Sequence, residues 1–267
     1  MRTKTLLIAS AALAAGILTS SAQTYSQNIV GYVSQTLPYN GNNGWAAVCV
    51  PLDFAAGNTL TNLFPNPGPG GGSNPLDYDL VYIWNGAGYS IYTIDSDYPS
   101  GVANSADNAG VASPAVTPGS LIFINNAGGN APALTTNVLA GTVHVDTAPT
   151  GAQTVGTTTQ VLLPGFNYVA SKLPVGGGIS SVLQLTNPGP GSGGNVLDYS
   201  LVYVPNIVNG NFTGYQIVTI DSDYASGFAN AADNAQALEP QIPVGAGFII
   251  DFVDNNSVGS YTWTQQY

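Results

Sequence analysis

Short runs of aromatic and β-branched residues recur along the chain, separated by Gly, Pro, Asn and Asp. Leu80–Trp84 and Tyr89–Ile94 are two such runs, and residues 85–88 between them have the length of a hairpin turn. Residues 201–204 and 215–220 predict a second hairpin with a longer connection. The same pattern predicts further strands at residues 29–36, 45–52, 121–125, 166–172, 248–252 and 260–265.

The spacing of Gly and Pro limits the helices. The chain has 33 Gly and 18 Pro, which interrupt it too often for long helices. Alanines concentrate in residues 100–109 and 226–238, which leaves room for one short helix in each half. Short strands with frequent turns predict an all-β fold, built as β-sandwich or barrel-like units.

A repeat divides the sequence in two. Residues 89–109 recur 126 positions later as residues 215–235, and 16 of these 21 positions are identical. Shorter matches precede and follow this segment in the same order, such as 76–82 with 197–203. Each copy has a common size for a domain, so we predict two tandem, homologous β units. Their predicted bounds are 23–140 and 141–267, after a signal peptide at 1–22.

One predicted strand lies between the two copies and could belong to either unit. Residues 141–159 are rich in Thr, Gly and Ala, which is typical of a boundary. Within this stretch, residues 142–146 form either the last strand of the first unit or the first strand of the second. Two copies are too few for an open solenoid, which needs about three repeats. We therefore expect a side-by-side pair of units.

The N-terminus has the three parts of a secretory signal. Arg2 and Lys4 are followed by an apolar stretch at residues 6–18 and by small residues at 20–22. We predict cleavage before Gln23 and a secreted, extracellular or cell-surface location. The apolar stretch is shorter than the roughly 20 residues that span a bilayer, and a retained anchor is the alternative. After cleavage we expect no membrane insertion.

Removal of the signal would leave Lys172 as the single Lys or Arg beside 14 Asp and Glu. Nucleic acid is therefore not an expected partner, because proteins neutralise phosphates with clustered Lys and Arg. The carboxylates also have almost no basic partners. Each must stay hydrated, accept hydrogen bonds from backbone amides or share a cation.

Several short motifs resemble those of one group of exported proteins. They are QNIVGYV, LP, VPL, VYIWN and GAGFII, at residues 27–33, 37–38, 50–52, 81–85 and 245–250. The series is similar to that of a group of uncharacterised secreted bacterial β-rich proteins. The resemblance implies export and a β fold, and it implies no chemistry, because no activity is established for the group. The Asp-Ser-Asp-Tyr segments of the two repeats depart from the group's pattern.

The repeated acidic loop is the candidate metal site. Clustered carboxylate and amide oxygens suit Ca²⁺, which takes about 6–8 oxygen ligands in flexible geometry. At the end of a strand, Asp95 and Asp97 project to one side and repel each other unless solvent or a cation intervenes. The predicted ligands are Asp95, Asp97, Asn104 and Asp107 in the first unit and Asp221, Asp223, Asn230 and Asp233 in the second.

The spacing of these residues is not that of an EF-hand, since glycine stands at loop position seven and Ala106 at position 12. The alternative is a hydrated turn whose Asp and Asn side chains cap backbone amides. The sequence favours the turn, and calcium is the one candidate cofactor.

Residue types used in catalysis are scarce. His144 is the single histidine, no Gly-x-Ser-x-Gly elbow accompanies it, and Cys49 stands alone in an apolar run. We expect His144 on a strand face and Cys49 buried in the core. The sequence therefore predicts a protein that is not an enzyme, and a hydrolase using the loop aspartates is the open alternative.

Export, the repeat and the low content of Lys and Arg favour a structural function. The leading hypothesis is a cell-surface or extracellular matrix protein that assembles with itself into filaments through open edge strands. The alternative is a secreted carbohydrate-binding module, with or without calcium, that recognises a surface polysaccharide. Trp45, Trp84 and Trp263, together with the 15 tyrosines, are candidates for a sugar platform, although aromatic residues on strands more often pack in the core.

Overall fold

The computed structural model describes residues 30–37, 44–64, 75–127, 135–147, 156–185, 196–208, 211–254 and 258–266. The predicted signal peptide lies outside these residues. Within them the fold is all-β, with antiparallel sheets and one four-residue helix, α2 (Leu60–Leu63). None of these sheets closes into a barrel. In the described part of the chain, every helix is too short to cross a membrane.

A five-stranded sheet organises the first half. Its strand order is β2-β7-β4-β5-β6, and every neighbouring pair is antiparallel. β4 and β5 form the predicted first hairpin, with Leu80 opposite Thr93 and Trp84 opposite Tyr89. The five strands are β2 (Trp45–Cys49), β4 (Leu80–Trp84), β5 (Tyr89–Ile94), β6 (Val102–Asn104) and β7 (Leu121–Asn125).

The second half contains a sheet of the same order, β10-β16-β12-β13-β14. The repeated segments 89–109 and 215–235 occupy equivalent places, because each supplies the fourth and fifth strands of its sheet. The five strands are β10 (Gly165–Ala170), β12 (Leu201–Val208), β13 (Asn211–Ile220), β14 (Phe228–Asn230) and β16 (Gly247–Phe252).

Three smaller sheets complete the fold. One has the order β1-β8-β3, and the others pair β9 with β17 and β11 with β15. Thr142 of β8 pairs with Val30 and Asp53, and Val143 pairs with Leu52, all of the first half. The strand that the sequence could not assign to either unit is therefore the last strand of the first half. These strands are β1 (Val30–Leu37), β3 (Leu52–Asp53), β8 (Thr135–Val143), β9 (Thr157–Leu162), β11 (Gly177–Gly178), β15 (Gln241–Ile242) and β17 (Tyr261–Gln266).

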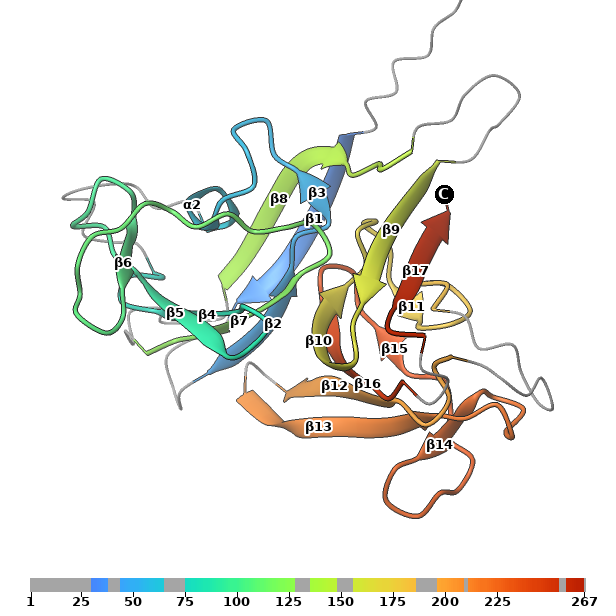
Figure 1. The fold of residues 1–267 in the computed structure, drawn as a ribbon. Helices are drawn as coiled ribbons and strands as arrows, with labels where there is room; N and C mark the ends of the chain where they lie inside the picture. Colours follow the sequence, from blue (N-terminus) through green and yellow to red (C-terminus); the bar gives the residue numbers. More distant parts are fainter. Residues whose placement is uncertain are drawn as a thin grey trace, which may run out of the picture.

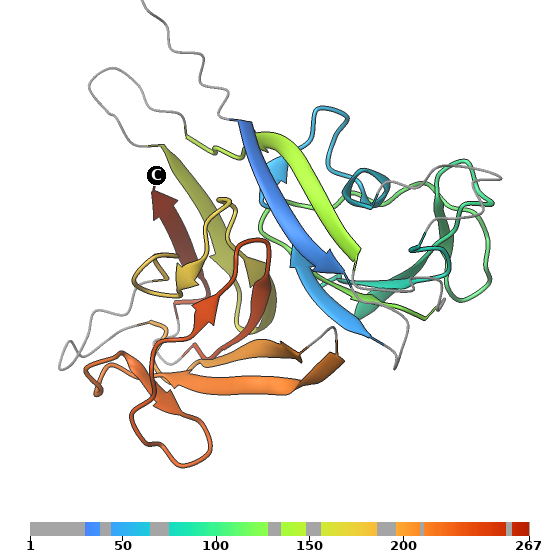
Figure 2. The same cartoon turned by 180° about the vertical axis from the view of Figure 1, so that it is seen from behind.

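The two halves lie side by side. Figure 1 shows β1 to β8, coloured blue to yellow-green, next to β9 to β17, coloured yellow to red. Figure 2 shows the same arrangement from behind.

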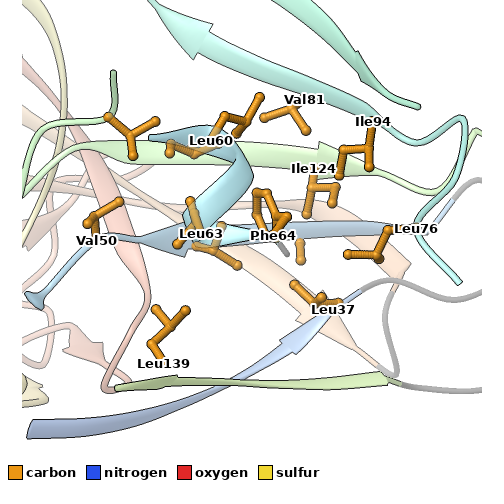
Figure 3. Close-up of a cluster of buried hydrophobic side chains, with 14 of the residues drawn as sticks. Leu37, Val50, Leu60, Leu63, Phe64, Leu76, Val81, Ile94, Ile124 and Leu139 are labelled. Carbon is orange, nitrogen blue, oxygen red and sulfur yellow. The ribbon is translucent and has the colours of Figure 1, made fainter. Parts of the chain in front are cut away.

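Each half has its own hydrophobic core. In the first, Leu37 and Leu139 of the small sheet join a buried cluster with Val81 and Ile124 of the large sheet (Figure 3). The second half has a matching cluster that includes Trp263 of β17, which is 1 % exposed. Because burial of apolar area is the main favourable term in folding, these two clusters fix the layers of each half.

The second strand of each large sheet, β7 in the first half and β16 in the second, is buried on both faces. Ile122 and Ile124 of β7 point into the core of the first half. Leu121 and Phe123 of the same strand instead form a third cluster with Ile249 of β16. Alternation along β7 thus assigns one face to its own core and the other face to the second half, which explains its continuous apolar sequence.

Backbone hydrogen bonds also join the halves. The Cys49 amide donates to the Gly245 carbonyl at 2.9 Å, and the Ala170 amide donates to Gly119 at 2.7 Å. Gly245 has a φ of 78°, and a Cβ there would lie 2.8 Å from Val33, so this close approach requires glycine. The Cys49 side chain is buried, as predicted, and its burial raises the pKa of the thiol to about 12.

The two alanine-rich segments, which left room for a short helix each, contain no helix. Residues 100–109 contain β6 and a turn, and residues 226–238 contain β14 and a turn. Asn104 Oδ1 accepts a hydrogen bond from the Ala106 amide, and Asn108 has a φ of 51°. Such local side-chain bonds satisfy the amides that a helix would otherwise use, so they outweigh the helix propensity of alanine.

Candidate functional site

An aromatic face covers the side of the first large sheet that turns away from its core. Trp45 and Tyr82 have ring centroids 5.1 Å apart, and Tyr82 and Tyr89 have centroids 5.9 Å apart. Phe123 stands opposite Tyr82 in the strand register, with its ring 6.5 Å from that of Tyr89. Residues two apart on a strand share a face, so the alternation on four strands gathers these rings.

The second hairpin extends beyond its counterpart and brings two more rings to this face. The β12–β13 register shifts between Asn206 and Ile207, which marks a bulge. Phe212 lies beyond the part of β13 that corresponds to β5, and its ring meets Tyr215 edge-on at 4.9 Å. Gly214 between them has a φ of 124°, a conformation that favours glycine.

These two elements enclose a pocket of about 300 Å³. Its walls are mainly apolar, and the described residues that line it include no carboxylate, imidazole or amine. Four lining residues come from the first half and two from the second, so neither half forms the pocket alone. They are Trp45, Tyr82, Tyr89, Phe123, Phe212 and Tyr215.

The polar atoms of these side chains are phenol hydroxyls and one indole N–H. Burial raises the pKa of Tyr82, Tyr89 and Tyr215, so their hydroxyls stay protonated at physiological pH. A hydrogen bond with Tyr168 also raises the pKa of Tyr89. The site can therefore stack a ligand ring and offer it a few donors. Small-ligand sites in proteins commonly combine apolar walls, few polar groups and volumes of about 300–1,000 Å³.

The first part of each predicted calcium loop is a hydrogen-bonded turn. Asp95 Oδ1 accepts from the Asp97 amide at 2.9 Å, and the Asp97 side chain is exposed. Ser96 donates to Asp77 through its amide at 3.0 Å and through its hydroxyl at 2.7 Å. Asp97 and then Asp95 are the main causes that raise the pKa of the Tyr78 hydroxyl. The second half repeats these bonds with Asp221, Asp223, Ser222 and Asp198.

The second part of each loop is a separate capped turn. Asn104 and Asp107 accept from the amides of Ala106 and Ala109, at 3.0 and 3.1 Å. Asn230 and Asp233 do the same for Ala232 and Ala235. Among the described residues, no three His, Cys, Asp or Glu side chains gather closely enough to hold a metal ion. The calcium site stays a prediction, and these contacts are those of its alternative, the turn.

The three tryptophans have different surroundings. Trp45 lines the pocket, whereas Trp84 stacks on Tyr168 with ring centroids 4.6 Å apart. Trp263 is buried in the second core, where its indole N–H donates to the Leu183 carbonyl at 2.7 Å. Of the three tryptophans, Trp45 alone belongs to the pocket.

Sequence reasoning counted the tyrosines among the platform candidates without singling out the three that line the pocket, and it missed Phe123 and Phe212. Tyr82, Tyr89 and Phe123 each lie in a predicted strand. Because side chains alternate between the two faces of a strand, these positions could have indicated a shared aromatic face. Phe212 had no such signal, because it lies in the segment predicted as the longer connection of the second hairpin. No protein family, curated protein or solved structure matches this chain. The site is therefore interpreted from its own geometry.

Proposed function

We propose that this chain is an exported, non-enzymatic protein that binds carbohydrate, and that the pocket between its halves holds one sugar ring. The observation that carries the proposal is the ring of six aromatic side chains, from both halves, around a volume of about 300 Å³. The partner would be a surface or extracellular polysaccharide, reached after cleavage of the predicted signal peptide.

A sugar ring matches the two kinds of surface in the pocket. A pyranose has an apolar face of C–H groups and a rim of hydroxyls. The apolar face can stack on an aromatic ring such as Trp45, since burial of apolar area is favourable. The rim must keep hydrogen bonds, because an unpaired buried hydroxyl costs about 1–3 kcal/mol. Tyr82 and Tyr215 can supply such bonds from the wall, and solvent can supply them at the mouth.

This proposal moves the sugar away from the acidic loops and makes calcium unnecessary for binding. The loop carboxylates Asp95 and Asp221 already accept backbone amide hydrogen bonds. The pocket, in contrast, has aromatic rings that face a volume large enough for a ligand.

A glycan array with matched variants tests the proposal. Trp45 in β2 and Phe166 in β10 occupy equivalent places: Trp45 pairs with Asn125, Phe166 pairs with Asp251, and each ring packs on a strand tyrosine. Phe166 is 52 % exposed and is not among the described pocket residues. We expect Trp45→Ala to weaken glycan binding at least tenfold, about 1.4 kcal/mol, and Phe166→Ala to bind as the native chain does.

The array is repeated with a chelator, which should leave binding unchanged. If no glycan binds, or if binding survives both Trp45→Ala and Tyr215→Ala, the proposed site is wrong. If binding disappears with the chelator and survives the pocket variants, the acidic loops are the better site.

The proposed domain organisation is two tandem, homologous units, at residues 23–140 and 141–267, each built as a β-sandwich. The equal order of the two large sheets supports it, as do the separate cores in which each large sheet covers the small sheets of its half. Since β8 pairs with β1, the boundary between the two units fits better directly after Val143.

Self-assembly, the leading hypothesis from the sequence, is the second candidate function. β1 is an edge strand of its sheet. Val30 and Tyr32 of β1 are 57 and 72 % exposed, and Val138 of β8 on the same face is 63 % exposed. An open edge beside an apolar face can pair with a strand of a second copy, which would give a filament.

Negative-stain microscopy and light scattering at raised concentration test the assembly. Tyr32→Lys should block it, because a charged side chain on an edge strand disfavours strand addition. Particles that stay monomeric in the native chain under all pH and calcium conditions would contradict this second candidate and would leave the sugar proposal untouched.

A further inference from the structure

The rings of the pocket between the halves stand at steep angles to one another. The planes of Tyr82 and Tyr89 make an angle of 90°, and those of Tyr89 and Phe123 make an angle of 76°. From the second half, Phe212 and Tyr215 meet at 71°. Rings at such angles cannot share one plane, so they form walls around the volume of about 300 Å³. The pocket is therefore a cage of aromatic rings, and it suits a round group as well as a flat one.

This aromatic cage has a buried part and an open part. Phe123 is 6 % exposed, whereas Tyr89, Phe212 and Tyr215 are between 37 and 40 % exposed. A ligand can thus enter from solvent and reach a ring that water barely contacts. The described lining residues are all uncharged side chains, so the cage offers a ligand mainly the negative faces and positive edges of its rings.

The charge of the chain around this cage is strongly negative. The full chain has a formal net charge of −11 at pH 7, with three Lys and Arg beside 14 Asp and Glu. The two basic side chains of the predicted mature chain contact carboxylates: Lys172 Nζ lies 3.2 Å from Asp146, and His144 Nδ1 lies 2.8 Å from Asp53. Neither is among the described residues that line the cage. The field of the protein therefore attracts a cation to this site and repels an anion.

The kind of cation follows from the groups that the walls lack. A primary ammonium is strongly hydrated and has three N–H donors, which need acceptors once water is removed. The described lining residues include no carboxylate that could accept them. A quaternary ammonium has no N–H group, so it leaves no donor unpaired. It is attracted to the faces of aromatic rings, most strongly to a Trp ring such as that of Trp45.

We propose that the aromatic cage between the halves also binds a quaternary ammonium group of the kind found in choline. The positive charge is held by ring faces from both halves, and the methyl groups cover the apolar walls. The inference rests on the same pocket as the proposed function, but it needs neither a sugar nor a hydroxyl donor. A sugar ring and a quaternary ammonium compete for this one volume.

Two probes of equal shape test the proposal on the native exported chain. They are choline and its neutral analogue dimethylbutanol, in which carbon replaces the quaternary nitrogen. Each is titrated into the protein, and the indole N–H signals are followed by NMR. We expect choline to move the Trp45 signal and to bind at least about fivefold more tightly than the analogue, since cation–π attraction acts on choline alone. The Trp263 signal should stay in place, because that side chain is buried in the second core.

A double variant separates ring faces from hydroxyls. Tyr82→Phe with Tyr215→Phe keeps both rings and removes both hydroxyls. Its affinity for choline should stay within about twofold of the native value, because cation–π attraction needs only the rings. Its affinity for an array-identified glycan should fall, because the proposed sugar contacts use these hydroxyls.

A single variant tests one ring face. Trp45→Leu keeps an apolar side chain and removes a ring, so it should weaken choline binding at least about threefold and change binding of the neutral analogue less. Phe166→Leu, outside the described pocket lining, is the matched control and should bind choline as the native chain does. Far-UV circular dichroism checks that each variant is folded, and the comparison of the two probes needs no variant.

Equal affinity for choline and the neutral analogue would overturn the proposal, as would a Trp45 signal that choline does not move. Either result leaves the sugar proposal to its own array test. Loss of choline binding in the folded double variant would also overturn it, since the hydroxyls would then hold the ligand. A chain that binds choline in this way and binds no glycan would contradict the proposed function alone.

Discussion

The two hairpins of the large sheets begin alike and end differently. The β4–β5 hairpin turns within residues 85–88, whereas β12 and β13 stay paired as far as Val208 and Asn211. The extra length leaves the strand order unchanged, because both sheets keep the same five-strand arrangement. It does bring Phe212 to the pocket, opposite the aromatic face of the first half. The extension thus adds one lining residue to the pocket without altering the strand order of the sheet.

The equivalent strands β7 and β16 also agree at one position and differ at the next. Ile124 of β7 and Ile250 of β16 both point into a core and are the same residue type. One position back, Phe123 and Ile249 point outward and differ. At this pair of neighbouring positions the core residue is the same in both halves, whereas the outward residue is aromatic only in the first.

The largest expected effect tests whether the two cores are equivalent. Ile124 and Ile250 are both fully buried. Ile124→Ala and Ile250→Ala should each lower the free energy of unfolding by about 2–5 kcal/mol, because each leaves a cavity. Urea unfolding measures the loss, and Val161→Ala at a position 58 % exposed should change it by less than about 0.5 kcal/mol. A large loss of unfolding free energy in one variant with almost none in the other would show that the two cores are not equivalent.

The next effect tests the role of the longer hairpin. Replacement of residues 205–214 by the short turn of the first hairpin, residues 85–88, removes Phe212. We expect affinity for an array-identified glycan to fall at least tenfold, about 1.4 kcal/mol, while far-UV circular dichroism stays native. Phe212→Ala alone should reproduce most of this loss. Unchanged affinity in the shortened chain would show that the extension does not build the site.

A smaller effect compares the two acidic turns. The Ser96 hydroxyl donates to Asp77 and the Ser222 hydroxyl donates to Asp198, at 2.7 and 2.6 Å. Ser96→Ala and Ser222→Ala should each cost about 1 kcal/mol of unfolding free energy, with the larger loss for Ser96, since Asp77 is the more buried acceptor. Chemical denaturation measures both. Equal stability of the native chain and both variants would mean that these bonds are not formed in solution.

The smallest effect concerns Asp146 and the stability of the fold in acid. Burial raises the pKa of Asp146, but hydrogen bonds from the Thr159 amide, His144 and Lys172 outweigh it and lower the pKa to about 2. A lowered pKa means that this stabilisation is present above about pH 4 and is lost as the pH falls toward 2. Because the side chain is 31 % exposed, we expect a change below about 1 kcal/mol. Between pH 5 and 2.5, Asp146→Asn should lose less Tm than the native chain.

Alternation of residue types was sufficient to predict most strands. The segments around Leu80–Trp84, Tyr89–Ile94 and Leu121–Asn125 are strands with the predicted bounds, because each is rich in β-branched and aromatic residues. β9 was missed, because residues 157–162 begin in a Thr-rich stretch that also fits a boundary. β6 and β14 were missed because alanine favours helices locally, and sheet pairing overrode that preference.

The pocket could not be predicted in the same way. Trp45 was named from the sequence as a platform residue, but its neighbours come from strands far apart in the chain and from the other half. Which faces of the two large sheets meet depends on the packing of Leu121, Phe123 and Ile249, and this contact leaves no periodic signal of its own. A site between repeated halves therefore needs the structure, even where each strand is predicted correctly.

The most direct test of the account is an NMR titration that follows the three indole N–H signals. The native chain is titrated with soluble oligosaccharides selected on the array, with Trp45→Ala to assign the pocket signal. The account predicts that the Trp45 signal moves and that the Trp263 signal, whose N–H is bonded to Leu183, stays in place. A Trp45 signal that does not move, while the amides of Asp97 or Asp223 shift, would contradict it and would place the ligand in the acidic turns.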